Sequence, residues 1–156
     1  MKLIESAPDL LDEEVAILNS DLFYNRISKD KECITLLDIT AEIEDGKRMG
    51  AERFLIQEGG EYVGVLEFLM TNPNDGCTWL GLLQIRKDAQ SKGYGRKAMD
   101  LFYDMIKQRE VERFRLGVIE GNEPGHRFWK RQGMLPVKSS VNQDGKTIVV
   151  YEKEWS

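Results

Sequence analysis

Side chains that bind metals or form disulfides are scarce in this sequence. Its 156 residues include two cysteines, Cys33 and Cys77, and a single histidine, His126, none of them close together in the chain. The count excludes a disulfide framework and argues against a zinc site, so we expect no metal. So few cysteines are typical of a protein in a reducing cytoplasm. Neither cysteine has an activating neighbour, and we expect both to be core residues.

Long apolar runs and linkers are also missing. The longest apolar run, residues 79–83, is far shorter than the roughly 18 residues of a membrane-spanning helix. The first acidic residue, Glu5, comes too early for a secretory leader. No low-complexity or Pro/Ser-rich segment divides the chain. At about 150 residues per domain, we expect one domain over residues 1–156 and no membrane partner.

Positive charge is scarce in the first half of the chain and abundant in the second. Residues 1–78 hold 17 acidic and 7 basic side chains, whereas residues 79–156 hold 10 and 15. A protein that wraps nucleic acid would be basic throughout, so we expect no nucleic-acid partner. The split favours two ligands of opposite sign, a cation near the first half and a polyanion near the second. Chance segregation of surface charge is the alternative.

The spacing of apolar residues predicts an alternation of strands and helices. We expect strands over 1–5, 53–58, 61–70, 77–85, 114–119, 134–137 and 147–154, and helices over 8–18, 35–48, 94–108 and 124–131. Ser6 and Asn122 are candidate helix caps. The unit 77–119 is strand–helix–strand, which predicts a parallel, right-handed crossover. The expected fold class is α+β, a mixed sheet with antiparallel N-terminal strands, one βαβ crossover and a C-terminal hairpin.

The loop between the strand ending at Ile85 and the helix starting at residue 94 predicts an anion site. Gly93 and Gly95 let the backbone approach a ligand and turn free amides outward. The first amides of a helix lack partners and carry the positive end of its dipole. Cationic side chains surround them: Arg86, Lys87, Lys92, Arg96 and Lys97. A phosphate-bearing ligand suits this loop.

A dinucleotide-binding fingerprint is a competing interpretation of the same glycines. Residues 93–98 match G-x-G-x-x-A. That fingerprint should follow its strand almost directly and open a doubly wound domain. Here a longer loop separates Gly93 from Ile85, and antiparallel strands precede it. We therefore favour a different phosphate ligand. A plain glycine-rich turn is the remaining alternative.

A second segment, residues 122–133, makes the anion loop more specific. Residues 90–95 resemble the pyrophosphate loop R/Q-x-x-G-x-G/A of the GNAT superfamily of acetyl-coenzyme A-dependent N-acetyltransferases. Asn122, Gly125, Phe128, Trp129 and Gly133 resemble that family's N-x-x-A-x-x-F-Y-x-x-x-G-F helix. The order of elements also agrees over nearly the whole chain.

The resemblance implies a cosubstrate, acetyl-coenzyme A (acetyl-CoA), and a set of residues that would hold it. The amide of Ile85 would bond the acetyl carbonyl, the amides of the loop would hold the pyrophosphate, and residues on the second helix would lie near the pantetheine and adenosine phosphates. The implied set is Leu83, Ile85, Gln90, Ser91, Lys92, Gly93, Tyr94, Gly95, Arg96, Asn122, Trp129 and Lys130.

The sequence departs from the family pattern in two places. Trp129 stands where a tyrosine commonly protonates the departing thiolate, and an indole N–H is not a usable acid. The thiolate of a thiol with a pKa of about 8.5 can leave without a protein acid, so we expect catalysis to be slower but not abolished. Local similarity to spermidine/spermine N-acetyltransferases covers about a dozen residues around 122–133. The acids that those enzymes carry on the strand before the loop are absent from residues 78–84.

Two carboxylates are the candidate general bases. Glu67 lies on the strand before the loop strand, and Glu120 ends the strand that follows the loop helix. Each could instead be a solvated or ion-paired side chain. The sequence thus predicts an enzyme that acetylates a primary amine, with a polyamine or other cationic small molecule as acceptor. Protein N-termini and aminoglycosides are alternative acceptors, a non-catalytic coenzyme A sensor is the rival function, and homodimer formation is left open.

Overall fold

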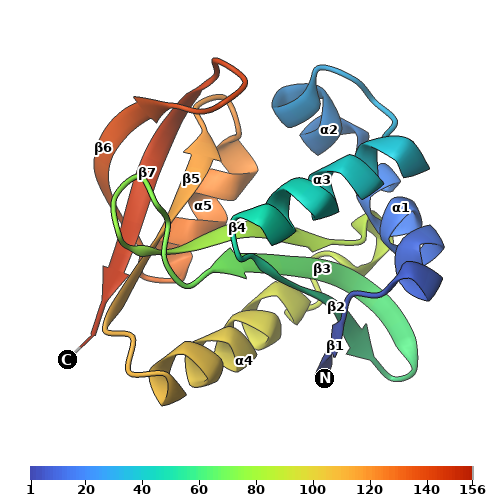
Figure 1. Cartoon of the computed structure of the whole chain (residues 1–156), viewed down its shortest axis with the longest axis horizontal. Coiled ribbons are helices and arrows are strands. Elements are labelled where there is room, and N and C mark those ends of the chain that lie inside the picture. The colour runs from blue at the N-terminus through green and yellow to red at the C-terminus, as the bar shows by residue number, and fades with distance from the viewer. Residues whose placement is uncertain (156) are drawn as a thin grey trace.

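One seven-stranded sheet forms the centre of the structure, a computed structural model that describes residues 1–155 (Figure 1). Its strand order is β1-β2-β3-β4-β5-β7-β6. The strands are β1 (Lys2–Glu5), β2 (Glu52–Glu58), β3 (Glu61–Leu69), β4 (Thr78–Ile85), β5 (Arg113–Ile119), β6 (Leu135–Val141) and β7 (Thr147–Glu154). All neighbours pair antiparallel except β4 and β5, which pair parallel. The mixed α+β sheet predicted from the sequence is therefore confirmed.

Helices cover both faces of the sheet (Figure 1). They are α1 (Leu11–Asn19), α2 (Leu22–Lys29), α3 (Leu36–Arg48), α4 (Tyr94–Gln108) and α5 (Glu123–Arg131), with short 3₁₀ turns η1 (Pro8–Leu10) and η2 (Lys87–Ala89). Leu55 and Val65 pack on α1, whereas their neighbours Ile56 and Leu66 belong to the core cluster that holds α4. The alternation of a strand's side chains thus divides the core into two layers.

Most expected elements are found, including Asn122 as the cap of α5. The helix α2 was not expected, because its pattern is inverted. Its buried side chain is polar, Asn25, while Leu22 and Phe23 are each 42% exposed. Apolar periodicity cannot detect such a helix.

Two further expectations are wrong. Cys33 is exposed rather than a core residue, since it lies in the loop between α2 and α3, while Cys77 is buried as expected. Ser6 does not cap a helix, because its hydroxyl donates to the buried carboxylate of Glu14. Within residues 1–155, no helix is long and apolar enough to cross a membrane.

Candidate active site

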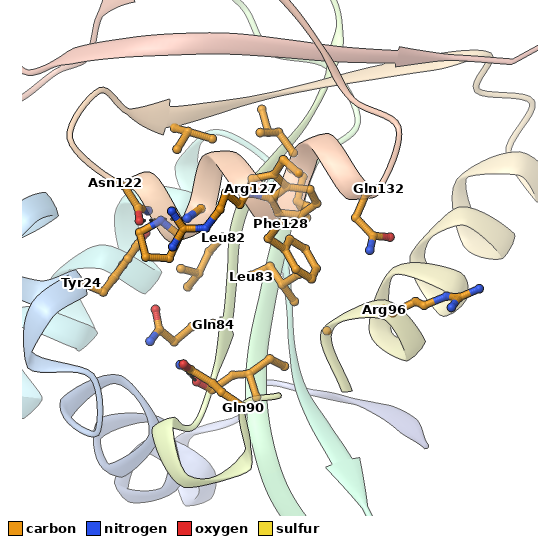
Figure 2. Close-up of a pocket in the computed structure, with 18 of the residues that line it drawn as sticks. Tyr24, Leu82, Leu83, Gln84, Gln90, Arg96, Asn122, Arg127, Phe128 and Gln132 are labelled. Carbon is orange, nitrogen blue, oxygen red and sulfur yellow. Dashed lines mark hydrogen bonds between the residues drawn. The ribbon is translucent and has the colours of Figure 1, made fainter. Parts of the chain in front are cut away.

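The sheet opens between β4 and β5. The two strands pair only at Thr78 with Phe114 and at Trp79 with Arg115, and beyond these positions they separate. A cavity of about 990 Å³ enters the gap, lined by β4, β5, the start of α4 and one face of α5. Figure 2 shows the side chains of α5, β4 and the loop before α4 converging on it. The site is therefore built on an interruption of the sheet.

Backbone amides of β4 point into this opening. The N–H of Arg86 donates to the carbonyl of Val63 on β3, and amide direction alternates along a strand. The N–H groups of Ile85 and Leu83 therefore point away from β3, toward the gap. The carbonyl of Ile85 also points away from β3, because it accepts from Nε2 of Gln90 at 3.0 Å. Two free donors thus line the gap beside β5.

The loop before α4 presents a second group of free donors. Ser91 and Gly93 have φ values of +65° and +80°, a conformation that turns successive amides toward one side. The amides from Ser91 to Arg96 have no acceptor within residues 1–155, and Gly93 caps α4 without a side-chain bond. Free amides at the positive end of a helix favour an anion.

Gly95 has a packing role as well. A Cβ at this position would lie 3.0 Å from Cε1 and 3.1 Å from Cζ of Phe128 on α5. The glycine therefore brings the first turn of α4 against the ring of Phe128. This contact joins the two segments that the sequence motifs single out.

Basic side chains dominate the lining of the large cavity. They are Lys87, Arg96, Arg127, Arg131 and Lys153, against the acidic Asp21 and Asp100. Arg127 and Arg131 are one helical turn apart, so both share the face of α5 that carries Phe128. The expectation from sequence missed these two arginines, because the helix is basic on more than one face.

The cofactor residues expected from the sequence converge on this cavity with two exceptions. Lys92 and Lys130 do not line it, because Lys130 stands on the outer face of α5 and Lys92 is exposed in the loop. Ten others line it: Leu83, Ile85, Gln90, Ser91, Gly93, Tyr94, Gly95, Arg96, Asn122 and Trp129. The amide of Gln90 also bridges Oδ2 of Asp21 and the carbonyl of Ile85, so it holds the loop to β4.

A smaller cavity of about 290 Å³ lies on the α2 and α3 side of the opening. It shares six lining residues with the large cavity: Tyr24, Leu80, Gly81, Leu82, Gly117 and Ile119. Its charged lining comprises Glu42, Glu67, Asp144 and Lys29. The two cavities thus meet at the separated strands, one basic and one acidic, and the sign of each matches the charge split of the sequence.

Glu67 belongs to a buried cluster around one arginine. Arg53, 7% exposed, donates from Nη1 to Oε2 of Glu67 at 2.9 Å, from Nε to Oε1 of Glu14 at 2.7 Å and from Nη2 to Oε2 of Glu42 at 3.2 Å. Burial raises the pKa of Glu67 above its ordinary value, although the charge of Arg53 opposes the shift. Burial also acts to raise the pKa of Glu42, but Lys29 and Arg53 outweigh it and hold that pKa low.

The second candidate base, the single histidine and Trp129 have different surroundings in the structure. Glu120 is exposed in the turn after β5 and lines neither cavity. His126 is buried, with Nδ1 2.7 Å from the hydroxyl of Tyr151 and Nε2 bonded to two backbone carbonyls, which leaves it no free nitrogen. Trp129 lines the large cavity and meets Phe128 edge to face.

Tyr24 is the phenol on the wall shared by both cavities. The sequence offered no sign of it because α2 was not expected.

The mixed sheet opens between two parallel strands. Free amides and cations lie at one end of the gap, and buried carboxylates lie beside it. This arrangement is typical of a group-transfer enzyme with an anionic cosubstrate. The chain belongs to the GNAT acetyltransferase family, whose model matches residues 15–134. It is therefore an acetyl-CoA-dependent N-acetyltransferase. Among residues 1–155, no group of three or more His, Cys, Asp or Glu side chains is arranged to hold a metal ion.

Solved structures share the fold at low sequence identity. An acetyltransferase from Thermus thermophilus is 24% identical, with a TM-score of 0.80 over 99% of this chain and 96% of that one. A Salmonella typhimurium enzyme, described as modifying the N-terminal serine of the 50S ribosomal subunit protein L7/L12, is 14% identical, with a TM-score of 0.79 over 99% and 94%.

A PaiA N-acetyltransferase from Thermoplasma acidophilum, solved in complex with coenzyme A, is 13% identical, with a TM-score of 0.70 over 99% of this chain and 98% of that one. No curated protein matches the chain by sequence. At these identities the likeness shows the fold alone, so the acceptor must be argued from the site itself.

Proposed function

We propose that the chain transfers the acetyl group of acetyl-CoA to the primary amine of a small cationic acceptor, and that residues 1–156 act as one domain. The observation that carries this proposal is the meeting of two cavities of opposite charge where β4 and β5 separate. A polyanionic cosubstrate suits the basic cavity. An ammonium group suits the acidic one.

The chain's own groups fit acetyl-CoA. Free amides from Ser91 to Arg96 would hold the pyrophosphate, and Arg127 and Arg131 would neutralise further phosphate charge. Donors pointing into the gap from Leu83 and Ile85 would bond the pantetheine amide and the acetyl carbonyl. The cosubstrate supplies an activated thioester. An amide bonded to its carbonyl oxygen stabilises the negative charge that develops there during attack.

Glu67 supplies the base in this proposal. An alkyl ammonium of pKa about 10.4 is protonated at neutral pH, and freeing its lone pair costs about 4–5 kcal/mol. Glu67 would accept that proton, directly or through a water molecule, because this residue lines the small cavity. Its raised pKa brings it closer to neutral pH, where a general base is most effective. Glu120, which lines neither cavity, is the weaker candidate.

Protonation of the leaving thiolate does not depend on Trp129. Its indole N–H can donate a hydrogen bond but cannot release a proton near neutral pH. A thiolate of pKa about 8.5 leaves without a strong acid, and Tyr24 is a phenol on the wall common to both cavities. Trp129 would then shape the cavity and exclude water.

Polyamines are the acceptor class that we favour. Three acidic residues, Glu42, Glu67 and Asp144, line the small cavity with one basic residue, Lys29. Arg53 pairs with Glu42 and Glu67 but also with Glu14, so carboxylates remain in excess among the described residues of this cluster. A compact molecule with more than one ammonium group suits that balance. Peptide N-termini are the second acceptor class to test, since two enzymes that share the fold are described as acetylating ribosomal proteins.

A panel of amines tests the proposal. Release of free thiol from acetyl-CoA would be followed with spermidine, 1,4-diaminobutane, an aminoglycoside and peptides that begin with serine or alanine. We expect the highest kcat/KM with a polyamine. A preference for peptides would replace the acceptor class, and tight acetyl-CoA binding without thiol release from any amine would favour the sensor.

A further inference from the structure

The last turns of α3 contain a glycine at a position where the backbone conformation does not require one. Gly46 lies within the helix and is not among the residues with positive φ. Glycine weakens a helix interior relative to alanine. Its presence here therefore calls for a reason other than backbone conformation.

The reason is the carboxylate of Glu67. A Cβ on Gly46 would lie 2.5 Å from Oε1 of Glu67, closer than such atoms can approach, and 3.3 Å from Cβ of Ala51. The first of these neighbours is the end of a flexible side chain. A methyl group at position 46 would therefore push the Glu67 carboxylate aside more readily than it would disrupt the fold.

The other oxygen of the same carboxylate is fixed by an ion pair. Oε2 accepts from Nη1 of Arg53 at 2.9 Å, and Arg53 is itself held by Glu14, whose side chain is fully buried and accepts from Ser6. Oε1 has no hydrogen-bond donor within residues 1–155. The two oxygens thus differ: Oε2 is bound to Arg53, whereas Oε1 has no donor among the described residues and occupies the space beside Gly46 that a side chain would fill.

We propose that Gly46 and Arg53 are positioning residues for Glu67, and that they leave Oε1 as the atom that takes the proton of the acceptor ammonium. The inference rests on the proposed function, in which Glu67 is the base. The N–H bond of the ammonium breaks, its electron pair stays on nitrogen, and the proton forms a bond to Oε1 before it passes to solvent. Gly46 and Arg53 touch neither reactant and act only through the carboxylate.

Gly46→Ala tests this directly. Replacing a helical glycine by alanine ordinarily stabilises a protein, and displacing the Glu67 carboxylate from buried Arg53 opposes that gain, so we expect the melting temperature to change little. We expect kcat/KM for the acceptor to fall at least tenfold while KM for acetyl-CoA changes less than twofold. The midpoint of the acid limb of the pH profile should also shift, because the carboxylate moves relative to Arg53. Unchanged kcat/KM and an unchanged pH profile would overturn the inference.

Matched variants separate positioning from a structural effect. Ala41→Gly changes an exposed position of the same helix, and should lower stability without changing kcat/KM. In a protein that already carries Glu67→Asp, whose carboxylate is withdrawn by one methylene, Gly46→Ala should change kcat/KM less than twofold. A full tenfold loss in that background would show that the alanine acts elsewhere and would overturn the inference.

The contact with Ala51 has its own control. If Gly46→Ala alone lowers stability, the double variant Gly46→Ala with Ala51→Gly removes that contact and keeps the one with Glu67. The same loss of kcat/KM is then expected. Glu67→Gln distinguishes a failure of the proposed base from a failure of the positioning inference. If Glu67→Gln leaves kcat/KM intact, the proposed base is wrong. If Glu67→Gln lowers kcat/KM strongly but Gly46→Ala does not, only the positioning inference fails.

Discussion

The two sides of the opening between β4 and β5 are built in different ways. The basic side consists of backbone amides in the loop before α4 and of side chains one helical turn apart on α5. The acidic side depends on contacts between distant segments, such as the pair of Glu14 and Arg53, which are 39 positions apart. The first side is encoded locally, whereas the second exists only after the chain has folded. Variants should therefore fail differently on the two sides.

Glu67→Gln should have the largest effect, and only on the acidic side. General-base catalysis contributes about 10²- to 10⁴-fold, so we expect kcat/KM for the amine to fall at least 100-fold. The amide keeps the shape of the side chain, so the affinity for acetyl-CoA, measured by calorimetry, should be unchanged. Equal losses in both quantities would mean that the two sides are not independent.

The pH dependence of kcat/KM gives a second test of Glu67. Because burial raises the pKa of Glu67, its carboxylate gains a proton at a higher pH than an ordinary glutamate, whose pKa is about 4.3. In the unmodified enzyme kcat/KM should therefore fall as the pH drops through that raised value. Glu67→Gln should abolish this limb. A limb that persists in the variant would assign the base elsewhere.

Gly95→Val should have the next largest effect, on the basic side. A side chain here meets the ring of Phe128 and displaces the free amides at the start of α4. We expect the dissociation constant for acetyl-CoA to rise about tenfold, which is about 1.4 kcal/mol. Circular dichroism would check that the fold survives. An unchanged dissociation constant in a folded variant would refute the phosphate-loop assignment.

Removing one arginine should weaken the basic side more gently. Arg131→Gln removes one of several cations around the large cavity, and exposed charges are screened by salt. At low ionic strength we expect affinity for acetyl-CoA to fall about three- to fivefold, and less at high salt. Lys130→Gln, on the outer face of α5, is the matched control and should change little. Equal effects of the two variants would argue against a defined phosphate contact.

Trp129→Tyr should have the smallest effect. It restores a phenol at the position where the family commonly has one. If protonation of the thiolate limits turnover, kcat should rise about two- to fivefold with little change in acetyl-CoA affinity, the sign of an interaction made only in the transition state. A fall in kcat would instead show that the indole closes the cavity.

The parts of the fold that the sequence predicts are those with local signals. Asn122, as a capping residue, predicts the start of α5, and the spacing of apolar residues predicts α4. The helix α2 was invisible because its buried side chain, Asn25, is polar. That amide donates to the carbonyls of Leu18 and Glu32, a requirement that appears only once those segments meet.

The candidate site divides along the same line. Two glycines and the cations around them predict the anion loop, because backbone donors need no distant partner. Glu67 could be named as a base, but nothing in its neighbourhood along the chain signals Arg53, Gly46 or the raised pKa. Lys130 was expected at the cavity and Arg127 was not, because a basic helix alone does not tell which face turns inward. Tertiary contacts make those decisions.

The short ladder between β4 and β5 has a mechanical consequence. With two paired positions between them, the half-sheets β1–β4 and β5–β7–β6 each keep their own hydrogen bonds if they rotate slightly about that seam. Part of the resistance to such rotation comes from α4, whose Phe102 packs on Phe68 of one half-sheet and on Phe114 of the other. The aromatic contacts of α4 therefore help to set the width of the gap. A smaller side chain at position 102 would let the gap vary in width, although Gly81, which lines the cavity there, is distant from residue 102 in the sequence.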